Sequence, residues 1–279
     1  MQEHKTIEEL LILPSQASRR YFHDLVSYRE LLYFFVWRDL LVRYKQAVFG
    51  VGWALFRPLL NMAVFAFVFG KVARFSADQH LSYGLFVLAA TLPWQFFASS
   101  VVDGTNGLIN HSHLISKTYF PRILLPLSQI LVNLVDFAIA TLVLIGWGAL
   151  TQQLSPWFFL TSPLAILLAC TLTSGMAFWL SALTVRYRDF KIIVPFFVQF
   201  GMFISPVGYG TSAIPESWRW VFALNPMVGV IDSFRWTFLE VSYPGMGWNI
   251  FTSVAISLTL LATGFCYFRK MERSFADEI

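Results

Sequence analysis

Long apolar stretches alternate with short polar segments along most of the chain. Six stretches reach the roughly 20 mostly apolar residues that a membrane-spanning helix needs, at 51–72, 82–102, 123–150, 158–184, 192–210 and 248–268. The pattern predicts an all-α integral membrane protein with six transmembrane helices, of which the third and fourth are long enough to require tilt. Because no internal repeat or Ser/Gly-rich linker divides the sequence, we expect one domain over residues 1–279.

The segment before the first span, residues 29–46, has the pattern of an amphipathic helix. Its apolar run has only seven residues, too few to cross a bilayer. One helical face carries apolar residues spaced by three or one, namely Tyr33, Val36, Trp37, Leu40, Leu41 and Tyr44. The polar residues off this face are Arg38, Asp39, Arg43 and Lys45. We expect a helix along the cytoplasmic membrane surface, which serves either as an anchor or as a collar that also docks a cytoplasmic partner.

Residues 211–247, before the last span, are too apolar for a free loop and too interrupted for a crossing. Pro215 can begin one short helix, and Asn225 followed by Pro226 is an N-cap pattern for a second. Four charged residues exclude a lipid-facing crossing: Glu216, Arg219, Asp232 and Arg235. We therefore expect two short re-entrant helices at the outer face, forming either a packed cap or an exit gate. The gate residues would be Pro215, Trp218, Trp220, Asn225 and Pro226.

Composition and charge place this layout in a membrane and orient it. Hydrophobic residues make up 57% of the chain and charged residues 13%, which leaves too little charged surface for a soluble fold of this size. Sixteen of the 20 Lys and Arg residues fall on one side of the layout and flank apolar runs. This bias puts both termini in the cytoplasm, with 1–50 before the spans and 269–279 as a tail, and does not indicate nucleic-acid binding. Arg57, inside the first apolar run, is expected to extend to the cytoplasmic headgroups.

Motifs for catalysis, nucleotide binding and metal binding are absent from the sequence. No G-x-x-x-x-G-K-[ST] phosphate loop occurs, and Cys170 and Cys266 lie in apolar runs, as small packed residues do. His111 and His113 are two residues apart and would point apart on a helix, so we expect no metal site and no cofactor in this chain. Asp136 lies deep in the third span with Asn133 one turn before it. A proton relay usually needs several such groups, so we favour a structural hydrogen-bonded pair.

Three segments resemble one family of transporters. The stretch 38–58 (RDLLVRYKQAVFGVGWALFRP), the end of the fifth span at Phe203–Val207 and the segment Leu224–Met227 are similar to ABC-2 type permeases. The similarity is closest to permeases that export O-antigen, teichoic acid and related cell-surface polysaccharides. The resemblance implies a transport subunit of the bacterial inner membrane that has no ATPase site of its own. ATP and Mg²⁺ would bind to a separate partner.

The resemblance also implies an assembly and its contacts. Two copies of the permease would pair with two ATP-binding cassette subunits, and the channel would form between the permeases. Segments 29–46 and 103–122 would contact the ATPase, which gives as interface residues Arg38, Asp39, Arg43, Lys45, His111, His113 and Lys117. The segment 211–247 would correspond to the family's periplasmic gate.

The mechanism that we expect is the outward threading of a lipid-linked polysaccharide from the cytoplasmic side. Sugar rings present C–H faces that pack on aromatic rings, so an aromatic tunnel would hold a glycan loosely. The residues expected to line it are Trp94, Phe96 and Phe97 in the second span and Phe196, Phe197, Phe200 and Phe203 in the fifth. The alternative for each ring is packing against lipid or a neighbouring helix.

Three other functions stay open at this point. An ion-driven secondary transporter would show inverted repeats and clustered intramembrane charges. A membrane-embedded glycan transferase would show clustered acids or histidines at the interface, of which Asp103, His111 and His113 are a sparse version. An ABC-2 exporter of a small lipid or drug would share the whole pattern. Charge reversal at Arg38 or Arg43 is expected to lower the coupling of the ATPase while leaving membrane insertion intact.

Overall fold

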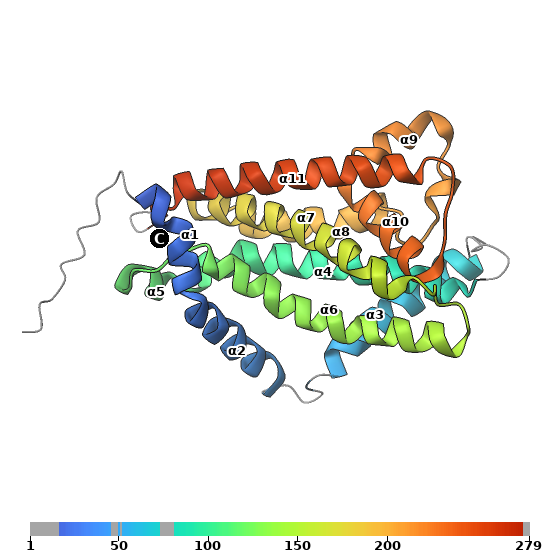
Figure 1. Ribbon diagram of the computed structural model, residues 1–279, viewed down its shortest axis with the longest axis horizontal. Helices are drawn as coiled ribbons and strands as arrows, with labels where there is room; N and C mark the ends of the chain where they lie inside the picture. Colours follow the sequence, from blue (N-terminus) through green and yellow to red (C-terminus); the bar gives the residue numbers. More distant parts are fainter. Residues whose placement is uncertain (1–16, 46–49, 51, 73–80, 276–279) are drawn as a thin grey trace, which may run out of the picture.

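The computed structural model describes residues 17–45, 50, 52–72 and 81–275, which are mostly helical and contain no strand. The elements in chain order are α1 Ala17–Ser27, α2 Arg29–Lys45, α3 Gly52–Phe65, η1 Ala66–Val72, α4 Tyr83–Asn110, α5 Ser112–Lys117, α6 Leu124–Leu150, α7 Phe158–Arg186, α8 Phe190–Ile204, η2 Thr211–Ala213, α9 Glu216–Ala223, α10 Pro226–Leu239 and α11 Met246–Met271. The long helices run side by side (Figure 1). The all-α prediction is confirmed for the described residues.

Four of the described helices are long and apolar enough to cross a membrane, namely α4, α6, α7 and α11. The other two expected spans are shorter apolar helices, α3 with 14 residues and α8 with 15. A 15-residue helix is about 22 Å long, less than the roughly 30 Å of a hydrocarbon core. The expected span 192–210 ends at Ile204 because Ser205 precedes Pro206 and takes an extended ψ of 147°. The first expected span divides into α3 and the π-helical η1.

Helix α4 forms the centre of the bundle. It packs against α3, α6, α7, α8 and α10, and most of its side chains are buried. Beside α4, helices α7 and α11 pack closely against each other. Glycines lie where the two helices cross. A Cβ atom on Gly175 would lie 2.6 Å from the backbone nitrogen of Leu261, and one on Gly264 would lie 2.6 Å from the carbonyl oxygen of Gly175. Small residues therefore allow these two backbones to approach, as is common between membrane helices.

The bundle has two different ends (Figure 1). One end of the bundle holds α1, α5 and the last turns of α11, and we call it the α5 end. The other end holds α9 and α10, and we call it the α9 end. The first and last described helices thus meet at the same end, as a layout with both termini on one side requires. Which side of the membrane the α5 end faces remains a prediction.

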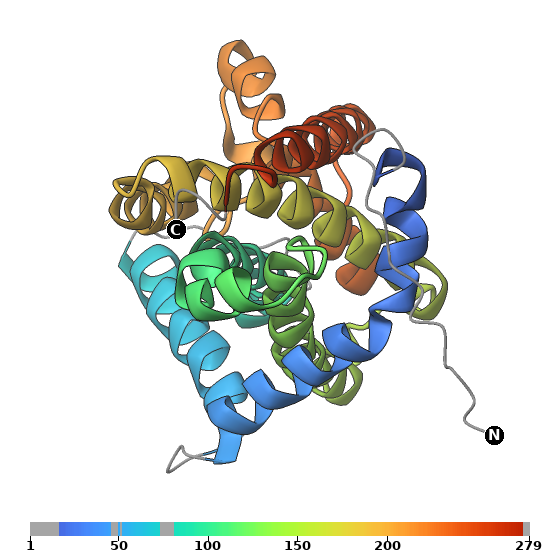
Figure 2. The same ribbon diagram turned by 90° about the vertical axis from the view of Figure 1, so that its left-hand side faces the viewer.

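Helix α2 differs from the expected surface helix. It buries Phe35 and exposes Tyr33 and Trp37, whose rings stack at 6.4 Å. Arg43, which the periodicity puts off the apolar face, turns toward α6 together with Tyr44 of that face. Figure 2 shows α1 and α2 wrapping around one side of the bundle toward α3. Polar side chains on α6 give Arg43 its partners and so reverse the orientation expected from periodicity.

The segment before α11 contains two short helices, with the boundaries that its sequence indicates. Helix α9 follows Pro215, and α10 begins at Pro226 after an Asn225 cap whose side chain accepts a hydrogen bond of 3.0 Å from the N–H of Met227. The two helices differ in burial. Helix α10 is buried almost throughout, whereas α9 exposes Trp218 and Trp220.

Candidate functional site

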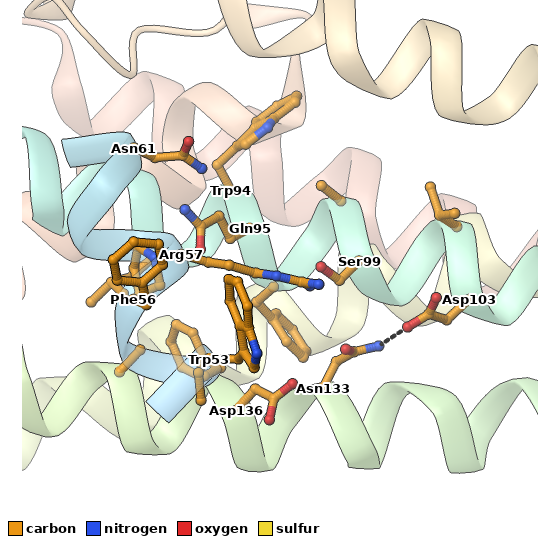
Figure 3. Close-up of a pocket in the computed structure, with 18 of the residues that line it drawn as sticks. Trp53, Phe56, Arg57, Asn61, Trp94, Gln95, Ser99, Asp103, Asn133 and Asp136 are labelled. Atoms are coloured by element: carbon orange, nitrogen blue, oxygen red, sulfur yellow. Dashed lines mark hydrogen bonds between the residues drawn. The ribbon is translucent and has the colours of Figure 1, made fainter. Parts of the chain in front are cut away.

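A cavity of about 850 Å³ opens between α3, α4, α6 and α8, beside the end of α2. Its wall is aromatic in part and polar in part (Figure 3). The residues that line it include Trp53, Phe56, Arg57, Asn61, Trp94, Gln95, Phe96, Ser99, Asp103, Asn133, Asp136 and Gln199. A mixture of flat rings and hydrogen-bonding groups suits a ligand with both apolar faces and hydroxyls.

One group of polar side chains joins α2 to α4 and α6 at this cavity. The Arg43 guanidinium donates to Asp136 at 2.6 Å, to the Asn133 side-chain oxygen at 2.8 Å and to Asp103 at 3.1 Å. Tyr44 donates to Asp136, and the Asn133 amide donates to Asp103 at 3.0 Å. We call these five residues the Arg43 cluster. The sequence predicts a hydrogen bond between Asp136 and Asn133. In the structure each of them binds Arg43 on α2 instead.

The predicted tunnel residues separate into two groups. Trp94, Phe96 and Phe97 of α4 are 5%, 3% and 9% exposed, and the first two line the cavity. The four predicted residues of α8 lie on its other face and are 52–68% exposed, namely Phe196, Phe197, Phe200 and Phe203. Sequence reasoning missed Trp53 and Phe56 of α3, which line the cavity. Their spacing of three residues within the segment 38–58 could have indicated a shared face.

The predicted ATPase interface contains exposed residues and residues that attach α2 to the bundle. Lys45, His113 and Lys117 are exposed. Arg38 pairs with Asp39 at 2.8 Å and contacts the ring nitrogen of His111. The other bonded members are Asp39, which accepts from Gln129 of α6, and Arg43 in its cluster. The exposed residues are therefore the ones that a partner can reach directly, while Arg38, Asp39 and Arg43 attach α2 to the bundle.

The chain after α5 is attached to the end of α11. The backbone N–H of Arg122 donates to the Glu272 carboxylate at 2.7 Å, and the Arg122 guanidinium donates to the Glu272 carbonyl oxygen at 2.5 Å. Arg269 lies 4.1 Å above the Tyr21 ring of α1. The pKa of the Glu272 carboxyl is raised above its ordinary value, mainly because the group is buried. Phe120 packs on Phe35 of α2 at 5.8 Å, so this loop is held from two sides.

Replacing Glu272 tests this attachment. We expect Glu272→Ala to lower the free energy of unfolding by about 1–3 kcal/mol, because the Arg122 N–H loses its acceptor. Glu272→Gln should stay close to the wild type, because its amide oxygen can accept the same bond and burial already disfavours the charge. Thermal unfolding of the detergent-solubilised protein measures both. Equal losses in the two variants would contradict the hydrogen-bond assignment.

At the α9 end, a second buried polar group connects α10 to the chain after α8. The Arg235 side chain lies 3.7 Å above the Phe86 ring and donates to the carbonyl oxygens of Val207 at 3.0 Å and Tyr209 at 3.2 Å. Asp232 accepts from Thr211 at 2.9 Å, from Asn249 at 3.2 Å and from Tyr243. We call Asp232 and Arg235 with these partners the Arg235 cluster. The sequence predicts only that these charges avoid lipid.

The predicted gate residues lie at the same end of the bundle as this cluster. Trp218 and Trp220 are 59% and 67% exposed on α9, with Pro215 just before it. The Asn225 amide donates to Ser205 at 3.0 Å, which attaches the start of α10 to the end of α8. The tryptophans are therefore on the surface, whereas Asn225 and Pro226 belong to the packed part of this end. No group of three or more possible metal ligands occurs among the described residues.

Comparison with known proteins gives consistent results over most of the chain. The family model described as ABC-2 type transporter matches residues 30–239. The O-antigen export system permease protein RfbA of Myxococcus xanthus is 30% identical over 262 residues, which cover 93% of this chain and 99% of that protein. Two proteins of the same description from Klebsiella pneumoniae are 30% and 28% identical over 253 residues, covering 89% of this chain and 94% of each relative.

Proposed function

Since this chain belongs to the ABC-2 type transporter family, we propose that it is the permease subunit of an ATP-driven exporter of an O-antigen-like, lipid-linked polysaccharide. The relatives from two bacteria are named O-antigen export system permeases, and the similarity to this chain covers nearly their whole length. The resemblance of residues 38–58 to polysaccharide-exporting permeases points the same way.

The observation that carries the proposal is the cavity between α3, α4, α6 and α8. Trp53, Phe56 and Trp94 offer ring faces, while Gln95 and Ser99 offer hydrogen-bonding groups. A glycan has the same two kinds of surface, C–H faces and hydroxyls. In the mechanism that we propose, the polysaccharide passes this wall and is released at the α9 end, where α9 and α10 act as the outer gate.

We propose that a second copy of the chain covers the exposed faces of α3 and α8. The four phenylalanines of α8 lie on one such face, and the α3 face exposes Phe56, Leu60 and Val64. In a dimer built on these faces, the α8 phenylalanines would approach the path between the copies. The two short apolar helices would then span the membrane as part of that interface, with six helices per copy.

We place the ATP-binding partner at the α5 end. His113, Lys117 and Tyr119 are exposed there, and Lys45 is exposed at the end of α2. In this arrangement the α5 end faces the cytoplasm, and both termini are cytoplasmic. A movement of the partner would reach α2 through Phe120 and α11 through Arg122. Nucleotide-driven movement would then act on two sides of the bundle.

Complementation tests the function. A bacterial strain lacking its O-antigen permease is given this chain together with the ATPase encoded beside it, and surface polysaccharide is followed by immunoblotting. We expect surface O-antigen to return only when both subunits are present, and ATP hydrolysis to need the ATPase subunit. Hydrolysis by the isolated chain, or surface polymer that does not depend on this chain, would contradict the proposal.

A further inference from the structure

Arg57 is a cation in the wall of the cavity, without a partner among the described residues. It stands in the apolar helix α3, is exposed, and forms no hydrogen bond or ion pair with any residue that the structure describes. Figure 3 shows its side chain extending across the cavity toward Ser99, with Gln95 and Trp53 on its two sides. Its reach to the cytoplasmic headgroups, which its sequence position predicts, stays a prediction. A charge among apolar membrane helices is costly unless something compensates it.

The nearby acids do not provide that compensation. Asp103 and Asp136 line the same cavity, but both bind Arg43, at 3.1 Å and 2.6 Å. Asp136 also accepts from Tyr44, and Asp103 from Asn133. Two carboxylates thus lie within the cavity wall, yet neither comes within ion-pair distance of Arg57. The positive charge of Arg57 remains available to a ligand.

A second donor in the same wall lacks a partner. The Nε2 atom of Gln95 is shielded from solvent and makes no hydrogen bond with the described residues. A buried donor left unsatisfied costs free energy that an acceptor on a ligand would recover. Gln95 and Ser99 are one helical turn apart on α4 and therefore share the face that meets Arg57. Arg57, Gln95 and Ser99 thus line the same part of the cavity.

We infer that this part of the cavity is a binding subsite for a lipid-borne phosphate group, with Arg57 as its charged donor and Gln95 and Ser99 as neutral donors. A guanidinium presents a planar fork of N–H groups that matches the oxygens of a phosphate. The apolar part of such a ligand has a surface to lie on, because Trp94, Phe96 and Met202 line the same cavity. The phosphate can come from two kinds of lipid. If it belongs to the lipid carrier of the glycan, the inference rests on the proposed function. The other source is a membrane phospholipid.

Lipid binding to the intact transporter tests the subsite. The chain is purified with its ATPase subunits, and native mass spectrometry measures the affinity for a polyprenyl diphosphate, for dioleoylphosphatidylglycerol and for an uncharged polyprenol. The variants are Arg57→Gln and Arg57→Lys. The matched control is Arg188→Gln, which removes the same charge from an exposed position outside the cavity. Melting temperatures of all variants show whether they are folded.

We expect Arg57→Gln to weaken binding of the diphosphate lipid by about tenfold to a hundredfold. Arg57→Lys should lose less, and Arg188→Gln should bind like the wild type, as should every variant with polyprenol. A loss confined to the diphosphate lipid assigns the carrier as source, and a parallel loss for phosphatidylglycerol assigns the phospholipid headgroup. Unchanged binding, or an equal loss for polyprenol, would overturn the subsite.

Competition in the wild type keeps the inference testable if Arg57→Gln fails to fold. Inorganic diphosphate should displace the diphosphate lipid but not polyprenol, and a failure to compete would refute the phosphate contact. The outcome is separate from that of the proposed function. A wild-type transporter that binds diphosphate lipid through Arg57 but restores no surface polysaccharide would retain the subsite and reject the function.

Discussion

Replacing Arg235 with alanine is expected to lower the free energy of unfolding by about 3–5 kcal/mol, the range found when one partner of a buried charged group is removed. Arg235 is 2% exposed, and its guanidinium serves two carbonyl oxygens of the chain after α8 as well as the Phe86 ring. The variant leaves these carbonyls without donors and Asp232 without the neighbouring positive charge. Thermal unfolding of the solubilised protein, together with the folded yield, measures the loss.

Arg219 provides the control for this change. It carries the same charge at the same end of the bundle, but its side chain is 42% exposed, pairs with Glu216 at 3.5 Å and donates to the carbonyl oxygen of Ile214 at 3.2 Å. Exposed pairs of this kind contribute little, so we expect Arg219→Ala to change stability by no more than about 0.5–1 kcal/mol. Arg235→Lys should lie between the two, because an ammonium group keeps the charge but cannot serve both carbonyls in the geometry of a guanidinium. Equal melting temperatures for Arg235→Ala and Arg219→Ala would contradict the structural role.

The Arg235 cluster also bears on the proposed gate. Arg235 binds the chain that leaves α8, and Asp232 binds Thr211 of η2 and Asn249 of α11. A movement of α10 would therefore carry the end of α8 with it or break several buried hydrogen bonds. Any opening at this end then involves α8 and α10 together, while the exposed α9 has few such bonds to break.

The helices were predictable because the signals for them are local. The N-cap at Asn225 and the proline after it depend on neighbouring residues alone, and the structure forms that cap. Apolar composition over 20 or more residues likewise predicts α4, α6, α7 and α11. The shorter α8 shows the limit of this signal. The apolar run of the sequence continues past Ile204, but the structure places the residues that follow in a turn.

The site was less predictable because its contacts are long-range. Arg43 meets partners 60 to 93 residues further along the chain, and nothing near Arg43 in the sequence indicates them. The sequence showed one acid deep in a span, whereas the fold places Asp103 and Arg43 beside it. Which aromatic side chains line a cavity depends on how each helix is rotated. That rotation puts Trp94 in the wall and Phe197 on the surface.

Charge reversal at Arg43 is the second large effect that the structure predicts. Arg43→Glu would place a third carboxylate beside Asp103 and Asp136, which now share one guanidinium. Because these side chains are 27–36% exposed, we expect a loss of about 1.5–3 kcal/mol in the free energy of unfolding, the range for hydrogen bonds to charged groups, followed by loss of export. This differs from the outcome expected if Arg43 served only to dock the ATPase, in which case coupling would fall while the fold stayed intact.

Lys45 is the matched control, because it lies two residues away on the same helix, is exposed, and accepts the same change as Lys45→Glu. If Arg43 is structural, Arg43→Glu melts well below Lys45→Glu, and the double variant Arg43→Glu with Asp136→Arg regains part of the stability, because it restores an opposite pair between α2 and α6. If both single variants keep the wild-type melting temperature and lose export alike, Arg43 is a docking residue and the cluster contributes little. Melting temperature and surface polysaccharide, measured on the same four proteins, separate these two roles of α2.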